Sequence, residues 1–176
     1  SPGMTGAAVL SAKGAMRTGA GLVAVGIPEG LNPVIEMKLD EAMSQPLPQT
    51  NSGNLAKSAL QEILPRLDWA DCVVIGPGLG TESETGELLG NLLKVINKPL
   101  IIDADGLNLL AANPALLDKL PVGTVLTPHP GEFKRLTGST LNSTTDKFSL
   151  VSSCAVKWGV TVVLKGSPTI TGLPDG

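Results

Sequence analysis

The sequence contains little charge: Asp, Glu, Lys and Arg make up 16% of its 176 residues, against 42% that are hydrophobic. A chain of this length and composition buries a substantial core, so it should be globular and not disordered. The net charge of −3, the pI near 5.1 and the lack of a Lys/Arg stripe argue against a nucleic-acid partner. Gly and Pro interrupt the uncharged stretches, so none predicts a membrane-spanning helix or a membrane partner.

Cysteine is also scarce. Cys72 and Cys154 lie far apart, and their spacing is not that of a zinc site. Both fall within apolar patterns, so we expect two buried thiols. Because the chain shows no basic and apolar leader, its sequence predicts a cytoplasmic protein.

The chain has one histidine, His129, in the segment TPHPGEFKRLTG (127–138). Pro130 suits the first position of a helix and Glu132 suits its first turn, so one interpretation is that His129 simply precedes that helix. The alternative is a functional imidazole with a glutamate three residues further on. The other motifs of the chain bear on this choice.

Short apolar runs alternate with amphipathic patterns. The apolar runs predict strands at 22–27, 72–75, 100–102, 122–126 and 160–164, with a further candidate at 168–171. The amphipathic patterns predict helices at 5–18, 54–67, 83–96, 106–112, from 130 onward and at 148–158, the second of them capped by Asn54. This alternation predicts one α/β domain over 1–176, with three layers (α/β/α) and a mainly parallel central sheet. Residues 28–52 are the least regular and predict either a lid or an excursion over the sheet edge.

Each of the four strongest motifs directly follows an expected strand. They are GPGLG (76–80), DADGLN (103–108), TPHPGE (127–132) and KGSPT (165–169). In a parallel sheet the carboxyl ends of the strands share one edge, where open α/β proteins bind ligands. We therefore expect the four motifs to form one site.

Each motif also has a purely structural interpretation. GPGLG is either a tight strand-to-helix turn or a loop whose N–H groups cradle an anion or a flat ligand, and it is neither a Walker A loop nor GxGxxG. Asp105 either caps a helix or joins Asp103 and Glu132 around a Mg²⁺ ion, in part through water. Lys165 is either a solvated strand end or a phosphate contact.

In this order, the motifs resemble those of the ADP/ATP-dependent NAD(P)H-hydrate dehydratases, a carbohydrate-kinase family of the ribokinase-like superfamily. The resemblance spans nearly the whole chain and implies a ribokinase-like fold. The similar segments are TGAAVLSAKGAMRTGAGLVAVGIPE (5–29), VVIGPGLG (73–80), PLIIDADGLNLLA (99–111), VLTPHPGEFKRLTG (125–138) and VVLKGSPTITGLPDG (162–176).

The resemblance implies a role for individual residues. Ribokinase-like kinases carry Asn-x-x-Glu where this chain has His129-x-x-Glu132, so the histidine is expected to contact the hydrated nicotinamide nucleotide. The residues expected to line the substrate are Ala7, Gly78, Gly80 and His129. Those expected to bind ADP or ATP are Lys165, Gly166, Ser167, Pro168 and Thr169. Glu132, with Asp105 through water, is expected to organise Mg²⁺ and the phosphates.

The implied reaction is that of a hydro-lyase, which restores NADH and NADPH from their hydrated forms NADHX and NADPHX. ADP or ATP phosphorylates the ring hydroxyl, and phosphate then leaves. In the family an Asp in a Gly-Thr-Gly-Asp loop activates that hydroxyl, and no such loop occurs in these 176 residues. The resemblance therefore implies a domain that is incomplete at both ends, with its first strand before Ser1 and its catalytic Asp beyond Gly176.

Two rival functions remain open. One is a ribokinase-like kinase of a vitamin alcohol, against which the His-Pro-Gly-Glu sequence argues. The other is a catalytically inactive, truncated nucleotide-binding piece, which the missing Asp loop favours. The choice between ADP and ATP, homo-oligomer formation and a fused or separate NAD(P)HX epimerase are also left open.

Overall fold

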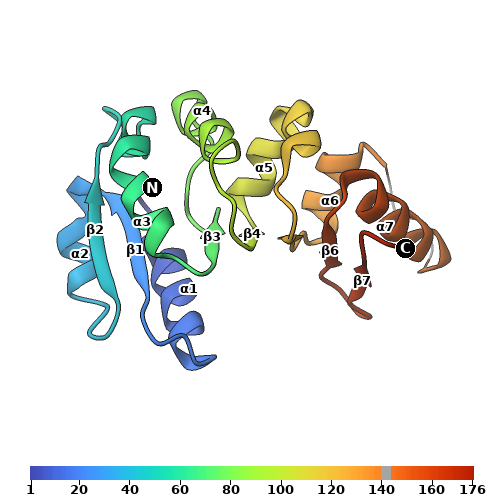
Figure 1. Ribbon diagram of the computed structural model, residues 1–176, viewed down its shortest axis with the longest axis horizontal. Coiled ribbons are helices and arrows are strands. Elements are labelled where there is room, and N and C mark those ends of the chain that lie inside the picture. The colour runs from blue at the N-terminus through green and yellow to red at the C-terminus, as the bar shows by residue number, and fades with distance from the viewer. Residues whose placement is uncertain (140–143) are drawn as a thin grey trace.

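The computed structural model describes residues 1–139 and 144–176, which form alternating helices and strands (Figure 1). The strands are β1 (Ala24–Pro28), β2 (Met43–Leu47), β3 (Val73–Ile75), β4 (Leu100–Ile102), β5 (Thr124–Leu126), β6 (Thr161–Leu164) and β7 (Ile170–Gly172). The α-helices are α1 (Thr5–Arg17), α2 (Asn32–Glu36), α3 (Leu60–Trp69), α4 (Ser83–Leu92), α5 (Asp105–Ala112), α6 (Pro130–Thr137) and α7 (Thr144–Trp158). Short 3₁₀ helices are η1 (Glu29–Leu31), η2 (Lys57–Ala59) and η3 (Pro114–Lys119).

A five-stranded sheet in the order β3-β4-β5-β6-β7 forms the centre of the fold. Strands β3 to β6 pair in parallel, and β7 pairs antiparallel with β6. A helix lies in every connection between two parallel strands, as such crossovers require. The α/β class and the mainly parallel sheet are confirmed.

The main core lies on one face of this sheet. Leu100 and Ile102 of β4 and Leu126 of β5 are fully buried, because in a strand alternate side chains point to the same face. They belong to one apolar cluster with side chains of α4, α5, α6 and α7, so these four helices share that face. On the opposite face Val74 is 50% exposed and its register partner Ile101 is half-buried.

A second, smaller sheet consists of β1 and β2 in parallel. Its strands lie beside α1 and α2 at one end of the molecule (Figure 1). Ile27 and Ile35 are buried there in a separate apolar cluster with Val9 of α1. Residues 28–52, which are irregular in sequence, therefore contribute a strand and a helix to this second sheet and its cover.

Three local expectations were wrong. Asn54 does not cap a helix, because η2 intervenes and α3 begins only at Leu60. Cys72 is exposed just before β3, whereas Cys154 is buried as expected and its burial raises the pKa of its thiol. The strand expected from 122 starts at Thr124, because its amide donates to Pro121 O at 3.2 Å in a turn. Within residues 1–139 and 144–176, no helix has the length and apolarity that crossing a bilayer requires.

The uneven burial of the two sheet faces can be tested on adjacent residues of one strand. We expect Ile102→Ala to lower the free energy of unfolding by roughly 2–5 kcal/mol, because it leaves a cavity in the packed core. Ile101→Ala removes the same atoms from the opposite face, where the side chain is half-buried, and should cost less than about half as much. Urea denaturation of both variants measures the difference, and equal losses would mean that the two faces are equally covered.

Candidate active site

The four sequence motifs lie at one edge of the central sheet. GPGLG follows β3, DADGLN follows β4, TPHPGE follows β5 and KGSPT follows β6. Because these four strands are parallel, their carboxyl ends point the same way. The expected convergence of the four motifs is therefore present in the fold.

The turn after β3 passes very close to the turn after β4. A Cβ at Gly76 would lie 2.8 Å from Gly106 N and closer still to the carbonyl oxygen of Asp103. Gly76 also has φ +125°, a conformation that side chains disfavour. Asp103 is held in this contact because its amide donates to Ile75 O at 3.1 Å. Only glycine fits at this crossing, so GPGLG is at least a structural turn.

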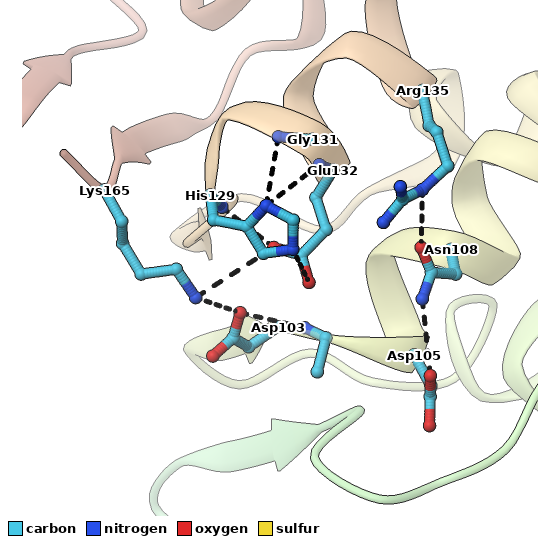
Figure 2. A network of polar contacts seen from close by, with 9 residues as sticks. Asp103, Asp105, Asn108, His129, Gly131, Glu132, Arg135 and Lys165 are labelled. Carbon is cyan, nitrogen blue, oxygen red and sulfur yellow. Dashed lines mark hydrogen bonds and ion pairs between the residues drawn. The ribbon is translucent and has the colours of Figure 1, made fainter.

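Asp105, the first residue of α5, connects GPGLG to that helix. Gly80 N donates to Asp105 Oδ2 at 2.9 Å, so this amide is already engaged by a carboxylate. The other carboxylate oxygen accepts from Asn108 Nδ2 at 3.3 Å, and Asn108 Oδ1 accepts from Arg135 Nε at 2.9 Å. A line of hydrogen bonds thus runs from α6 through α5 to the glycine loop, and Figure 2 shows its Arg135–Asn108–Asp105 part.

The expected substrate-lining residues near this loop do lie together. A Cβ at Gly78 would be 3.3 Å from the Ala7 Cβ, so α1 packs directly against the loop. A Cβ at Gly80 would collide with Asn54 Oδ1. Asn54 is 8% exposed, and it therefore closes the loop from the side of residues 50–56.

His129 is the N-cap of α6. Its Nδ1 accepts from Gly131 N at 3.0 Å and from Glu132 N at 3.4 Å, while Glu132 Oε2 accepts from His129 N at 2.8 Å. This reciprocal pair is a capping box, with imidazole in the place of the usual hydroxyl. The interpretation that His129 precedes a helix beginning at Pro130 is confirmed, and the cap is a stronger structural role than its sequence predicted.

The imidazole nevertheless faces solvent on its other side. The His129 side chain is 51% exposed, whereas that of Glu132 is 7% exposed. Since Nδ1 accepts two hydrogen bonds, the neutral ring carries its proton on Nε2, which lies 3.3 Å from Glu132 Oε1. The capping arrangement therefore fixes the ring while leaving part of it open to a ligand.

Lys165 joins three of the four motifs. Its Nζ lies 2.7 Å from Asp103 Oδ1 and 4.0 Å from Glu132 Oε2, and its amide donates to Pro128 O at 2.8 Å. In Figure 2 the lysine reaches across to Asp103, and Asp105 lies on the far side with Asn108. Lys165 is not a free solvated strand end.

The other expected nucleotide-binding residues form the turn between β6 and β7. Gly166, Ser167, Pro168 and Thr169 are exposed, and Thr169 Oγ1 donates to Gly166 O at 3.1 Å. The peptide bond between Ser167 and Pro168 is cis. This turn lies at the same sheet edge as the other motifs because it begins where β6 ends.

The acidic residues expected at a metal are divided between two groups. Asp105 belongs with Gly80 and Asn108, and Glu132 belongs with His129 and Lys165. In the described part of the chain, no three His, Cys, Asp or Glu side chains gather as a metal cluster. Mg²⁺ that is bound together with phosphates needs only one or two carboxylates, so Glu132 alone supplies a suitable oxygen donor.

A match to a known family covers the entire chain. The model of the Carb_kinase family, described as NAD(P)H-hydrate dehydratase, matches residues 1–176.

The chain belongs to this family.

Its relatives agree with that membership. A bifunctional NAD(P)H-hydrate repair enzyme from Moorella thermoacetica is 40% identical over 177 residues, which cover 100% of this chain and 33% of the relative. The structure of an ADP/ATP-dependent NAD(P)H-hydrate dehydratase from Bacillus subtilis, co-crystallised with ATP and Mg²⁺, is 29% identical with a TM-score of 0.73 and covers 100% of this chain and 60% of that one. A ribokinase-like superfamily protein from Enterococcus faecalis has a TM-score of 0.78 at 24% identity, over 98% of this chain and 57% of that one, which shows the ribokinase-like fold. The chain thus spans about a third to three fifths of these proteins.

Sequence reasoning missed several polar residues that shape this dehydratase-family site. The role of Asn108 could have been predicted from the sequence, because it lies three residues after Asp105 in the same motif and helix. Arg135 and Asn54 carry no local signal, since their partners lie 27 and 26 residues away in the chain, at Asn108 and Gly80. Glu82, just after the glycine loop, accepts from Ser52 and Thr50, and these hydrogen bonds lower the pKa of its carboxyl.

The crossing at Gly76 yields a stability test with a matched control. Gly138 also has a positive φ, but among residues 1–139 and 144–176 no atom beyond its chain neighbours lies within 4 Å of where its Cβ would be. Gly138→Ala should therefore cost only about 1–2 kcal/mol of unfolding free energy, for the backbone conformation alone. Gly76→Ala adds a collision with the backbone of Asp103, so we expect it to cost more than about 3 kcal/mol or to abolish folding. Denaturant unfolding of the two variants checks this, and equal costs would contradict the close crossing.

Proposed function

We propose that the protein uses ADP or ATP to dehydrate the hydrated nicotinamide nucleotides NADHX and NADPHX, restoring NADH and NADPH. The observation that carries the proposal is the family match over residues 1–176, together with the meeting of all four family motifs at one sheet edge. A relative named as an ADP/ATP-dependent NAD(P)H-hydrate dehydratase supports it. We propose this dehydratase activity for the protein that contains residues 1–176.

In the proposed reaction, the hydroxyl oxygen on the hydrated ring attacks the terminal phosphorus of the nucleotide. The bond from that phosphorus to its bridging oxygen breaks, and the hydroxyl proton passes to a base. The ring-nitrogen electrons then expel the new phosphate group, and loss of a ring proton restores the double bond. The protein has little covalent work in such a transfer, so its task is to position the reactants and stabilise charge.

The proposed substrate contacts are Ala7, Gly78, Gly80 and His129. The direct packing of Ala7 on Gly78 supports a shared wall for a flat nicotinamide ring. The fixed and half-exposed imidazole of His129 supports a directional polar contact from the motif after β5, two strands away from GPGLG in the sheet. Because the cap holds the ring through Nδ1, we assign the substrate contact to Nε2, which would share its proton between the substrate and Glu132 Oε1 at 3.3 Å.

The proposed nucleotide contacts are Lys165, Gly166, Ser167, Pro168 and Thr169. An ammonium at the sheet edge and an exposed turn suit phosphates and an adenylate group. Mg²⁺, when bound with the nucleotide, would neutralise phosphate charge. We assign its protein oxygen to Glu132, with Asp105 contributing through water.

A vitamin-alcohol kinase is the main rival and needs no elimination step. The presence of His129 where ribokinase-like kinases carry Asn favours the dehydratase. A coupled assay that offers NADHX and hydroxymethyl pyrimidine or thiazole alcohols in parallel separates the two. Phosphorylated alcohol without NADH formation would overturn the dehydratase, and nucleotide binding with neither product would favour the non-catalytic piece.

The broader setting is also proposed and not yet tested. Both cysteines are free thiols, which suits a cytoplasmic enzyme. The bifunctional relatives suggest that an NAD(P)HX epimerase acts with this protein, fused or separate. A homo-oligomer is compatible with the fold.

The two roles of His129 can be separated by substitution. His129→Ala removes both cap and imidazole, so it should lose roughly 0.5–2 kcal/mol of stability along with hydrate turnover. His129→Asn keeps a good capping side chain, so its stability should stay within about 0.5 kcal/mol of wild type. Its NADHX turnover should still fall roughly 10-fold or more, as loss of a directional substrate contact predicts.

NADH formation and thermal unfolding of both variants provide the measurements. Full turnover by His129→Asn would show that the imidazole serves only as a cap. A His129→Ala variant with unchanged stability and normal turnover would contradict both the capping role and the substrate contact.

The location of the activating base gives a second test. The 176 residues contain no Gly-Thr-Gly-Asp sequence, and the family resemblance assigns the base to that loop. We expect the 176-residue chain alone to dehydrate NADHX at least roughly 10²-fold more slowly than a chain extended through such a loop, since a positioned base contributes roughly 10²–10⁴ in rate. Comparable rates would indicate that Asp103 or Asp105 is the activating base.

A further inference from the structure

The ion pair between Lys165 and Asp103 links strand ends that are 62 residues apart in the chain. Its Nζ–Oδ1 distance is 2.7 Å, and the two side chains are 44% and 30% exposed. Pairs this accessible to water contribute little to stability. A close, half-exposed pair at the edge where the four motifs meet therefore calls for another role.

The Lys165 ammonium keeps capacity for an additional partner. An ammonium carries three donors, and Asp103 Oδ1 takes one of them. Glu132 Oε2, at 4.0 Å, is near enough to attract the charge but too far for a hydrogen bond. The ammonium is thus held in place while donors remain for an anion.

Asp103 is itself held rigidly. The oxygen that receives Lys165 also accepts from Ala104 N at 2.8 Å. The Asp103 carbonyl accepts from Gly106 N at 3.0 Å, and Gly76 packs against it. Ala104 has φ +50°, an unusual conformation for a residue with a side chain, and it turns the chain directly after Asp103. The backbone around Asp103 is therefore constrained on both sides.

We propose that Asp103 is a positioning residue, whose carboxylate holds the Lys165 ammonium in the orientation in which it meets the phosphates of a bound nucleotide. This inference rests on the nucleotide site of the proposed function. A long, flexible lysine loses conformational freedom when it binds a ligand, and holding it beforehand reduces that loss. Asp103 thus acts on the nucleotide through Lys165.

Two substitutions of Asp103 isolate this effect. Asp103→Asn and Asp103→Ala remove the same charge, but only Asn keeps an oxygen that can accept from Lys165 Nζ. We expect Asp103→Ala to bind ADP roughly 3–10-fold more weakly than Asp103→Asn, the range for one immobilised side chain. Titration calorimetry of the full-length protein with ADP, with and without Mg²⁺, measures the ratio. Equal affinities of the two variants would overturn the proposal.

The same pair of variants in a Lys165→Met background tests the route of the effect. If Asp103 acts through Lys165, the difference between Ala and Asn at position 103 should fall below about twofold, as a double-mutant cycle requires for coupled residues. An undiminished difference would overturn the proposal, because it would trace the effect to the Ala104 turn. Wild-type protein that binds no ADP would instead refute the nucleotide site of the proposed function.

A readout without nucleotide completes the test. A held ammonium reacts more slowly with an amine-acetylating reagent than a free one, and mass spectrometry reports each lysine separately. Lys165 should be acetylated several-fold faster in Asp103→Ala than in Asp103→Asn. Lys57, whose exposed pair with Glu87 is 3.5 Å long, is the internal control and should not change. An unchanged Lys165 rate would show that Asp103 does not hold it.

Discussion

The site depends on one close crossing of backbones. The turn after β3 and the turn after β4 share a space in which position 76 can carry no side chain. That crossing brings Asp105 within reach of the Gly80 amide and fixes the direction in which Asp103 leaves the sheet. The packing of α1 against Gly78 follows from the same loop geometry. Four parallel strands bring the motifs to one edge, but the glycine turn determines how closely two of them meet.

Charged side chains of both signs lie close together at the carboxyl edge of the central sheet. Lys165 is the cation between two carboxylates, Asp103 and Glu132, and it lies closer to Asp103. A nucleotide adds further negative charge to a place where the lysine is already paired. Binding therefore needs either a counter-ion with the phosphates or an ammonium that serves two anions at once. The proposed Mg²⁺ would meet the first need, and the three donors of Lys165 meet the second.

The parts predicted from sequence share a physical basis. Strands β3 to β6 are short, largely apolar runs, and each is followed directly by Gly, Asp, Thr or Lys, so the apolar pattern stops where the strand ends. That change predicted the sheet, its direction and the edge at which the motifs meet. The strand expected at 22–27 corresponds to β1, but β2 was not predicted, because it follows an irregular stretch and its burial does not alternate. The burial of Cys72 was predicted wrongly, because its apolar neighbours in sequence do not show where the strand begins. Cys72 lies one residue before β3 and is exposed. The links from Arg135 to Asn108 and from Lys165 to Asp103 arise from tertiary packing and have no local pattern.

At the start of α6, His129 has a structural role that leaves room for the ligand contact proposed for it. A helix N-cap needs an acceptor for the first amides, and both the Asn of ribokinase-like kinases and the imidazole of His129 supply one. We therefore expect an exchange of one for the other to keep the capping box with Glu132 and to change only the group that faces outward. Gly131 makes the larger ring tolerable, because a Cβ there would lie 2.8 Å from His129 Cε1. The HPGE sequence is therefore a single unit, in which Pro130 starts the helix, Gly131 makes room for the ring and Glu132 closes the cap. The half-exposed imidazole thus takes part in the capping box, which is what the proposed substrate contact of His129 requires.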